Sequence, residues 1–230
     1  MTLEELQEKI KFCNPNMPTK IVYIPKAQKS FLLAFTKDTP PFRTCKIVVM
    51  DNIKCFAPVA QIWYQITESP AQPYSKSLYD DNQIVSFTKQ KEYYISHFHT
   101  NYDYQGQGIG KYIYQLAQAH MDRTNINNSY GVISPLDDIK GVTKFGIDSD
   151  KAERKFLALM YHALGNTIIE SKYNDKPITK FRDSWTHNQK YEKLDDTQKE
   201  FVNSILKFEH LIKNENSQII DAKIKEDYQK

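Results

Sequence analysis

The sequence contains few of the residues that form disulfides or bind metal ions. Only 3 cysteines occur among 230 residues, at positions 13, 45 and 55. An odd number of widely spaced cysteines without a Cys-x-x-Cys pair indicates reduced thiols, which favours a cytoplasmic protein. The 6 histidines are scattered without a carboxylate or thiol at metal-ligand spacing, so no metal site is predicted.

Long apolar runs and arginine are also scarce. No stretch approaches the roughly 18 apolar residues of a membrane helix, and the acidic segment Thr2–Glu5 is unlike a signal peptide, so no membrane association is expected. The net charge is only +3, with 31 basic and 28 acidic residues, of which just 4 are arginine. A nucleic-acid partner is therefore not expected.

Glycine is rare, but it is concentrated at one place. Of 7 glycines, three (Gly106, Gly108 and Gly110) lie within five residues, between a strand-like and a helix-like segment. Glycine allows positive φ and a close approach of backbone to ligand, and the first turn of a helix has unpaired amides that favour an anion. The run therefore predicts a phosphate-binding loop, and the alternative is a tight turn that needs glycine only for packing.

Two common glycine motifs do not fit this loop. A dinucleotide-binding fingerprint would need glycine at Lys111, and a Walker loop would need glycine at Gln105 and a hydroxyl residue at Tyr112. The pattern that fits is Gln/Arg-x-x-Gly-x-Gly/Ala, which is met by Gln105, Gly108 and Gly110.

The segments around the loop have a clear order. Alternating and helical spacings of apolar residues predict strands and helices in turn, and a glycine or proline lies near several boundaries. The expected elements are a strand at 93–100, a helix at about 108–123, a strand at 130–133, a helix from an N-cap at Asp150 to a C-cap at Gly165, and a hairpin of 166–173 and 178–185.

The N-terminal part is less regular. Thr2 and Glu5 form a capping box that opens a short helix. Strands are expected at 20–24, 30–35, 45–50 and 59–67, followed by a loop at 69–81 and an extra strand at 84–88.

This order resembles the GCN5-related N-acetyltransferases, the GNAT superfamily, over roughly residues 90–185. Tyr161-His162-Ala163-Leu164-Gly165 is similar to that family's Tyr-x-x-x-Gly-Phe segment. The resemblance implies an α/β (α+β) fold, with a central mixed, mostly antiparallel twisted sheet flanked by helices. It assigns residues 1–185 to an acetyltransferase domain and 186–230 to a charged helical C-terminal extension.

The resemblance also implies a chemistry: transfer of an acetyl group from acetyl-CoA to a primary amine by direct attack in a ternary complex. Phe98 and Thr100 would contact the pantetheine arm, and Tyr161 would protonate the departing sulfur. The pyrophosphate would lie on the loop amides of Gln105, Gly106, Gln107, Gly108, Ile109 and Gly110. The acceptor would be a small molecule or a peptide.

A general base is harder to assign. The family places its base where Tyr94 and Ser96 stand, and neither side chain is a good base. His97 and His99 are one step out of register, so strict alternation points them to the other face, unless a bulge reverses the parity. Alternation therefore favours proton loss through water, and Glu68 or Glu92 acting through water is the remaining option.

The chain departs from the family pattern at three places. Arg154 stands where many members have Asn, Asn166 stands where Phe follows the glycine, and residues 135–149 form a longer insertion. The absent base and the departure at Arg154 leave open a CoA-binding protein that has lost catalysis. The lysines and 15 tyrosines leave open a module that binds RNA or another anion.

The last 45 residues have helical spacing in two stretches, which are separated at 214–217. Their apolar positions are Phe201, Ile205, Phe208, Ile212, Ile220, Ile224 and Tyr228. A helical pair packed on the domain is expected, and the alternative is an arm that forms a homodimer.

Overall fold

The computed structural model describes residues 1–38, 43–53, 57–69, 90–133, 149–173 and 176–227. The loop predicted at 69–81, the strand predicted at 84–88 and the insertion at 135–149 lie outside these ranges, except for their end residues. Ser69 ends a strand and Ser149 begins a helix.

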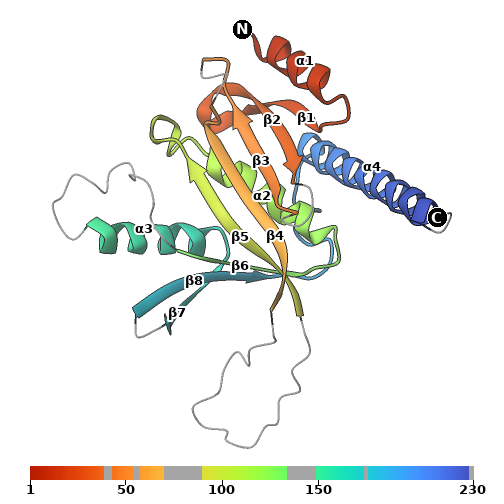
Figure 1. Cartoon of the computed structure of the whole chain (residues 1–230). Coiled ribbons are helices and arrows are strands. Elements are labelled where there is room, and N and C mark those ends of the chain that lie inside the picture. The colour runs from red at the N-terminus through yellow and green to blue at the C-terminus, as the bar shows by residue number, and fades with distance from the viewer. Residues whose placement is uncertain (39–42, 54–56, 70–89, 134–148, 174–175, 228–230) are drawn as a thin grey trace, which may run out of the picture.

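One sheet of eight strands forms the centre of the fold, in the order β1-β2-β3-β4-β5-β6-β8-β7. All neighbouring strands are antiparallel except β5 and β6, which are parallel. The strands are β1 (Thr19–Ile24), β2 (Lys29–Lys37), β3 (Cys45–Met50), β4 (Ala60–Ser69), β5 (Gln90–Thr100), β6 (Asn128–Val132), β7 (Thr167–Tyr173) and β8 (Lys176–Ser184). The sheet twists, so that β7 and β8 cross the direction of β2 to β4 (Figure 1). The predicted mixed, mostly antiparallel α/β fold is confirmed.

Helices cover both faces of the sheet, but unevenly. They are α1 (Leu3–Cys13), α2 (Ile109–Asp122), α3 (Ser149–Ala163) and α4 (Asp196–Asp227), with short 3-10 turns η1 (Pro25–Ala27) and η2 (Tyr102–Tyr104). α2 lies behind β3 to β5 in Figure 1, and α1 lies at the β1–β2 edge. No helix within the described ranges is long and apolar enough to cross a membrane.

Successive residues of β2 belong to two different hydrophobic cores, one on each face of the sheet. Phe31 and Leu33 belong to the large core under α2 and α4, whereas Leu32 packs with Leu3 and Leu6 of α1. Because successive residues of a strand point to opposite faces, α1 and α2 cover opposite sides of the sheet. Within the described residues, the α1 side of β4 and β5 is not covered by a helix.

The helix ends follow local chemistry. The capping box is confirmed: the Glu5 amide donates to Thr2 Oγ1 at 3.1 Å, and the Thr2 amide donates to Glu5 Oε2 at 2.9 Å. The expected N-cap of α3 is wrong, because the helix already begins at Ser149 and so includes Asp150. Gly165, at φ +94, ends α3, and the Asn166 amide donates back to the Tyr161 carbonyl.

The C-terminal segment is one helix, not a helical pair, since α4 continues through 214–217 without a break. Asparagine and serine lower helix propensity without forbidding a helix, so the composition of 214–217 did not predict a turn correctly. The N-terminal half of α4 packs into the main core through Phe201, Val202, Ile205 and Phe208.

A buried polar contact ties α4 to the sheet and to α2. Glu209 forms ion pairs with His120 (Nε2 to Oε2, 3.0 Å) and with Lys37. The Tyr64 hydroxyl lies 2.8 Å from His120 Nδ1. Burial opposes the charged carboxylate, but the hydrogen bonds and charges of His120 and Lys37 outweigh burial and hold the pKa of Glu209 at about 2.

Glu209 is therefore expected to stabilise the fold in a pH-dependent way. Its pKa is about 2 in the folded chain, against 4.5 for an ordinary glutamate. The stabilisation is complete above the unfolded value and is lost as pH falls from 4.5 to 2. Glu209→Gln is expected to lower the free energy of unfolding by roughly 2 kcal/mol at neutral pH, with the difference shrinking below pH 4.5. Urea unfolding at several pH values measures it.

Glu200→Gln is the matched control on the same helix, because Glu200 pairs with Lys20 at the surface and is 69% exposed. Exposed pairs contribute little, so its free energy of unfolding should stay close to that of the wild type. Equal losses for both variants, or a loss at Glu209 that does not change with pH, would contradict the prediction.

Candidate functional site

The three clustered glycines lie at the N-terminus of α2. Gly106 and Gly108 have φ of +81 and +82, which a side chain would strain. Gly108 is the N-cap residue, and the first backbone bond of the helix runs from the Tyr112 amide to the Gly108 carbonyl. Within the described chain, no backbone hydrogen bond is donated by the amides of residues 106–111. These amides and the helix dipole together favour an anion, and residues 105–110 are named the anion-binding loop for this property.

Side chains hold the segment before this loop in place. Gln105 Nε2 donates to the Thr100 carbonyl at 3.0 Å, and Gln107 Nε2 donates to the Asp103 carbonyl at 2.9 Å. The Tyr104 hydroxyl donates to Asp51 Oδ2 at 2.5 Å. The loop is thereby fixed to the end of β5 and to the residue that follows β3.

Asp51 is the fixed point of this contact. Burial acts to raise the pKa of Asp51, but hydrogen bonds from Lys29, Tyr104 and the Ile53 amide together have the larger effect. The net result is a lowered pKa, so the carboxylate stays charged. The Lys29 ammonium lies 2.7 Å from Asp51 Oδ2. Burial, together with the Asp51 contact, raises the pKa of Tyr104 to about 12, so Tyr104 remains a hydrogen-bond donor.

Lys26 of η1 adds a positive charge that the sequence gave no reason to expect. A Cβ built on Gly108 would lie 3.2 Å from Lys26 Cβ and 3.4 Å from Lys26 Cδ. The aliphatic part of Lys26 therefore packs against the N-cap of α2. Because the aliphatic part of the side chain contacts the anion-binding loop, the Lys26 ammonium group is kept within a side-chain length of it.

The predicted pantetheine contacts lie beside the same loop. A Cβ on Gly110 would lie 3.0 Å from Thr100 Oγ1 and 3.4 Å from Phe98 Cζ. Phe98 and Thr100 therefore both point toward the start of α2. The structure brings together all of the loop and strand residues that the sequence singled out as a cofactor site.

Tyr161 lies next to this group, in a cluster of aromatic rings. Its ring stacks on Phe181 at 3.8 Å between centroids, and lies 6.0 Å from Phe98 and 6.1 Å from Tyr114. Its exposed fraction is 7%, and burial raises its pKa. Core packing of Tyr161 is thus observed. Since Phe98 contacts both Gly110 and Tyr161, the phenol is one ring away from the anion-binding loop.

β5 separates from β6 beside these residues. Among the described residues, the two strands pair at Tyr93–Ser129 and Tyr94–Tyr130, and β5 diverges from β6 beyond Tyr94. Gly131 allows the Phe181 ring to lie close to this point, because a Cβ there would be 2.3 Å from that ring and 3.0 Å from the Ile95 carbonyl oxygen.

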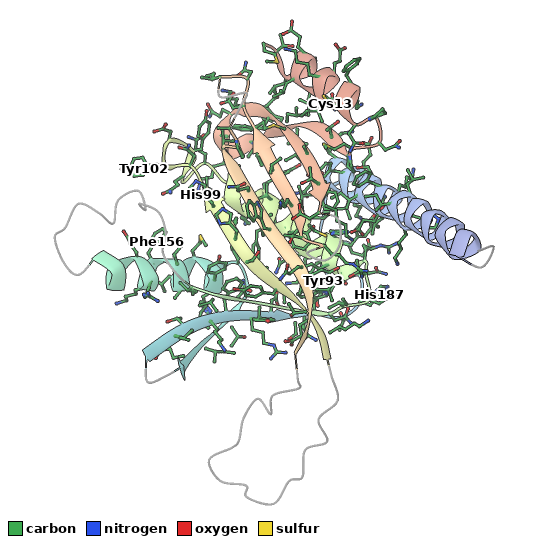
Figure 2. All side chains as sticks on the ribbon, in the orientation of Figure 1. Cys13, Tyr93, His99, Tyr102, Phe156 and His187 are labelled. Atoms are coloured by element: carbon green, nitrogen blue, oxygen red, sulfur yellow. The ribbon has the colours of Figure 1, made fainter. Side chains whose placement is uncertain are left out.

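A β-bulge occurs in β5 where the strands separate. Tyr64 pairs with Ile95 and Trp63 pairs with His97, which leaves Ser96 as the extra residue. The prediction of strict alternation is therefore wrong at this strand. Paired residues of antiparallel strands share a face. Gln61, Trp63 and Gln65 alternate along one face of β4 and pair with His99, His97 and Tyr94 in turn. The two histidines therefore lie on the side of Tyr94, away from α2. Figure 2 shows His99 near the end of β5 that adjoins Tyr102 of η2.

The carboxylate alternatives to these histidines are weakened or untested. Glu92 is buried and forms an ion pair with Arg182, so its charge is already neutralised. The side chain of Glu68 lies outside the part of the chain that the structure describes. Glu92 shares the Tyr94 face but precedes Tyr94 and is paired with Arg182, so the two imidazoles are the candidates on that face beyond the point where β5 leaves β6.

The departures from the family pattern have structural partners. Asn166 accepts a hydrogen bond from the Tyr114 hydroxyl at 2.9 Å and donates to the Tyr161 carbonyl at 3.0 Å. It therefore fixes both tyrosines of the aromatic cluster. Arg154 Nη1 donates to the Ile133 carbonyl at 3.3 Å, so this side chain is not simply solvated.

A hollow with a volume of about 260 Å³ lies on another side of α2. Its lining includes Lys111, Gln115, Gln118, Lys190 and Lys193. Both Gln118 and Lys190 contact Asp183 Oδ2 at 2.5 Å, so part of its positive charge is already neutralised. The unpaired amides at the helix N-terminus are the better phosphate site.

No protein-family model and no curated protein matches the sequence. Similar folds occur among solved structures. A chain of the NatC complex bound to Gag peptide and CoA is 14% identical, with 61% of this chain and 71% of that chain covered and a TM-score of 0.38. Arabidopsis thaliana NAA60 in complex with acetyl-CoA is 8% identical, with 61% of this chain and 75% of that chain covered and a TM-score of 0.37. A cAMP-binding acyltransferase from Mycobacterium smegmatis is 10% identical, with 89% of this chain and 60% of that chain covered and a TM-score of 0.47. At this level of similarity, the functional argument depends on the chain's own residues.

Proposed function

We propose that this protein is a GNAT-type N-acetyltransferase that binds acetyl-CoA at the N-terminus of α2 and acetylates a primary amine. The observation that carries the proposal is the set of amides at 106–111, which make no backbone hydrogen bond within the described chain and lie beside the part of β5 that diverges from β6. A pyrophosphate group needs such donors, and an extended pantetheine arm needs such a divergence. Acetyl-CoA contains both groups and supplies the acetyl group as a thioester.

Each group near the site has a role in the proposed reaction. The loop amides and Lys26 hold the pyrophosphate, while Phe98 and Thr100 align the arm that follows it. The amine nitrogen of the acceptor attacks the carbonyl carbon, so a C–N bond forms and the C–S bond breaks. Tyr161 donates its proton to the departing sulfur and regains one from solvent.

The attacking amine must also lose a proton. We assign this proton to an imidazole on the Tyr94 face, because the bulge at Ser96 places both histidines there. Water was favoured from the sequence only because strict alternation was assumed. An ammonium ion is not a nucleophile, so the rate should rise with pH as the acceptor amine becomes neutral.

Lys26→Ala is expected to weaken acetyl-CoA binding by about 3- to 10-fold, because one charged contact to phosphate is lost. The effect should shrink at high salt, since the contact is exposed. Isothermal titration calorimetry at two salt concentrations measures it. Lys11→Ala, which removes a lysine from the last turn of α1, is the control and should bind as the wild type does. Equal affinities for both variants would remove Lys26 from the site.

The acceptor can be sought by measuring thiol release from acetyl-CoA in the presence of polyamines, amino acids, aminoglycosides and peptide N-termini. An N-acetyltransferase should release CoA faster with at least one of these amines and form the N-acetyl product. CoA binding without turnover of any of them would instead favour a CoA-binding protein that has lost catalysis.

A further inference from the structure

Three side chains on the open face of β4 and β5 form a chain of hydrogen bonds. Trp63 Nε1 donates to Gln61 Oε1 at 3.2 Å, and Gln61 Nε2 lies 3.2 Å from His97 Nε2. The indole ring also packs against the imidazole of His97, with 4.9 Å between ring centroids. All three residues lie on the face away from α2.

Trp63 determines which way the Gln61 amide points. An indole nitrogen can only donate, so it must face the amide oxygen, and the amide NH₂ group must then face His97. The amide NH₂ group can only donate, so His97 Nε2 must accept. An accepting Nε2 carries no proton, which leaves the neutral ring of His97 with its proton on Nδ1.

Protonation of His97 would break this arrangement. A charged imidazole donates from both nitrogens, so its Nε2 proton would face the amide NH₂ group of Gln61. Turning the amide over would restore that bond, but it would place the NH₂ group against the indole N–H of Trp63. One hydrogen bond is lost in either case, and this favours the neutral ring.

The charged groups around His97 do not reverse this preference. From β3, the Lys46 ammonium lies 4.8 Å from the centroid of the Trp63 ring, and it pairs with Asp38 at 2.8 Å. From β5, His99 stacks at 6.1 Å between ring centroids, and Tyr94 shares the face. On β4, the facing residues Gln61 and Trp63 are uncharged. The Lys46–Asp38 pair has no net charge, so the hydrogen bonds decide the protonation state of His97.

We propose that Trp63 and Gln61 are positioning residues that hold His97 neutral with its proton on Nδ1, which leaves His99 as the imidazole that accepts the proton of the attacking amine. The part concerning His99 rests on the proposed acetyltransferase function. His97 has its Nε2 lone pair bound by Gln61 and its Nδ1 already protonated, so it cannot accept a proton unless the Gln61 contact breaks. His97 instead gives the acceptor site an uncharged wall between Trp63 and His99.

NMR of protein labelled with ¹⁵N in its histidines tests the protonation state. Long-range ¹H–¹⁵N spectra distinguish the two neutral tautomers, and loss of signals in His97→Gln assigns His97. The wild type should show the Nδ1–H tautomer. Trp63→Phe keeps a ring but removes the N–H, so Gln61 can turn over. The titration midpoint of His97 should then rise by about half to one pH unit, or the Nε2–H tautomer should appear.

Trp185→Phe is the matched control, because it removes the other tryptophan N–H of the chain, and that N–H has no hydrogen-bond partner within the described residues. His97 should titrate in this variant as in the wild type. An Nε2–H tautomer in the wild type, or identical His97 signals in Trp63→Phe, would overturn the proposal.

Kinetics test the assignment of His99 separately. His99→Gln is expected to lower kcat by about 10²-fold, in the range of a lost general base, and His97→Gln by much less. The reverse order would overturn the assignment. If no amine is acetylated while the wild type shows the Nδ1–H tautomer, the acetyltransferase function fails and the state of His97 stands.

Discussion

Gly110→Val is expected to abolish measurable binding of acetyl-CoA while leaving the protein folded. A Cβ at this position would lie 3.0 Å from Thr100 Oγ1 and 3.4 Å from Phe98 Cζ, so a valine fills the space between α2 and the end of β5. The pyrophosphate and the arm attached to it need that space beside the amides. Calorimetry gives the affinity, and circular dichroism with thermal unfolding checks the fold.

Gly108→Val should also prevent binding, but it carries an additional cost. Gly108 has φ of +82, where a side chain costs about 1–2 kcal/mol. Gly165→Val is the control for that cost, because Gly165 has φ of +94, no atom within 4 Å of its Cβ position and no part in the anion-binding loop. Unchanged affinity in folded Gly108→Val and Gly110→Val would remove the proposed CoA site.

Tyr161→Phe is expected to lower kcat by about 10²-fold or more, with acetyl-CoA affinity nearly unchanged. Phenylalanine keeps the ring that stacks on Phe181 at 3.8 Å, so the variant removes the hydroxyl and little else. Burial raises the pKa of Tyr161, so the phenol carries its proton across the physiological range, as a general acid must before the sulfur departs. Steady-state kinetics and calorimetry together separate turnover from binding.

Tyr114→Phe is the control within the same aromatic cluster. It removes the hydroxyl that donates to Asn166, so it should cost about 1 kcal/mol of stability without a comparable loss of kcat. If Tyr161→Phe turns over at the wild-type rate, Tyr161 serves packing alone and another group supplies the proton.

The sequence predicted most elements near the loop because their signals are local. The Thr2 capping box, the three glycines and the Gly165 stop each depend on residues a few positions apart. Phe98 and Thr100 lie beside Gly110 as predicted, because a tight loop between a strand and a helix brings the end of the strand close to the start of the helix.

The features that the sequence did not predict depend on contacts between distant segments. Lys26 meets Gly108 across more than eighty residues, and Glu209 meets Lys37 and His120 from three separate elements. No short-range pattern contains such pairs. The identity of the buried partner of His120 therefore needed the tertiary structure.

The bulge at Ser96 did leave a trace in the sequence. Tyr93, Ile95 and Phe98 all pack toward the α2 side of the sheet, and their spacing changes from two to three residues. Strict alternation cannot place all three on one face. Giving weight to these apolar positions would have located the extra residue and placed His97 and His99 correctly.

Titration of the wild-type protein with acetyl-CoA tests the central claim most directly. Saturable binding of one acetyl-CoA per chain is expected, with a heat signal that disappears in folded Gly110→Val. A folded wild-type protein that gives no heat with acetyl-CoA or CoA, but binds RNA with an affinity that falls steeply with salt, would contradict it.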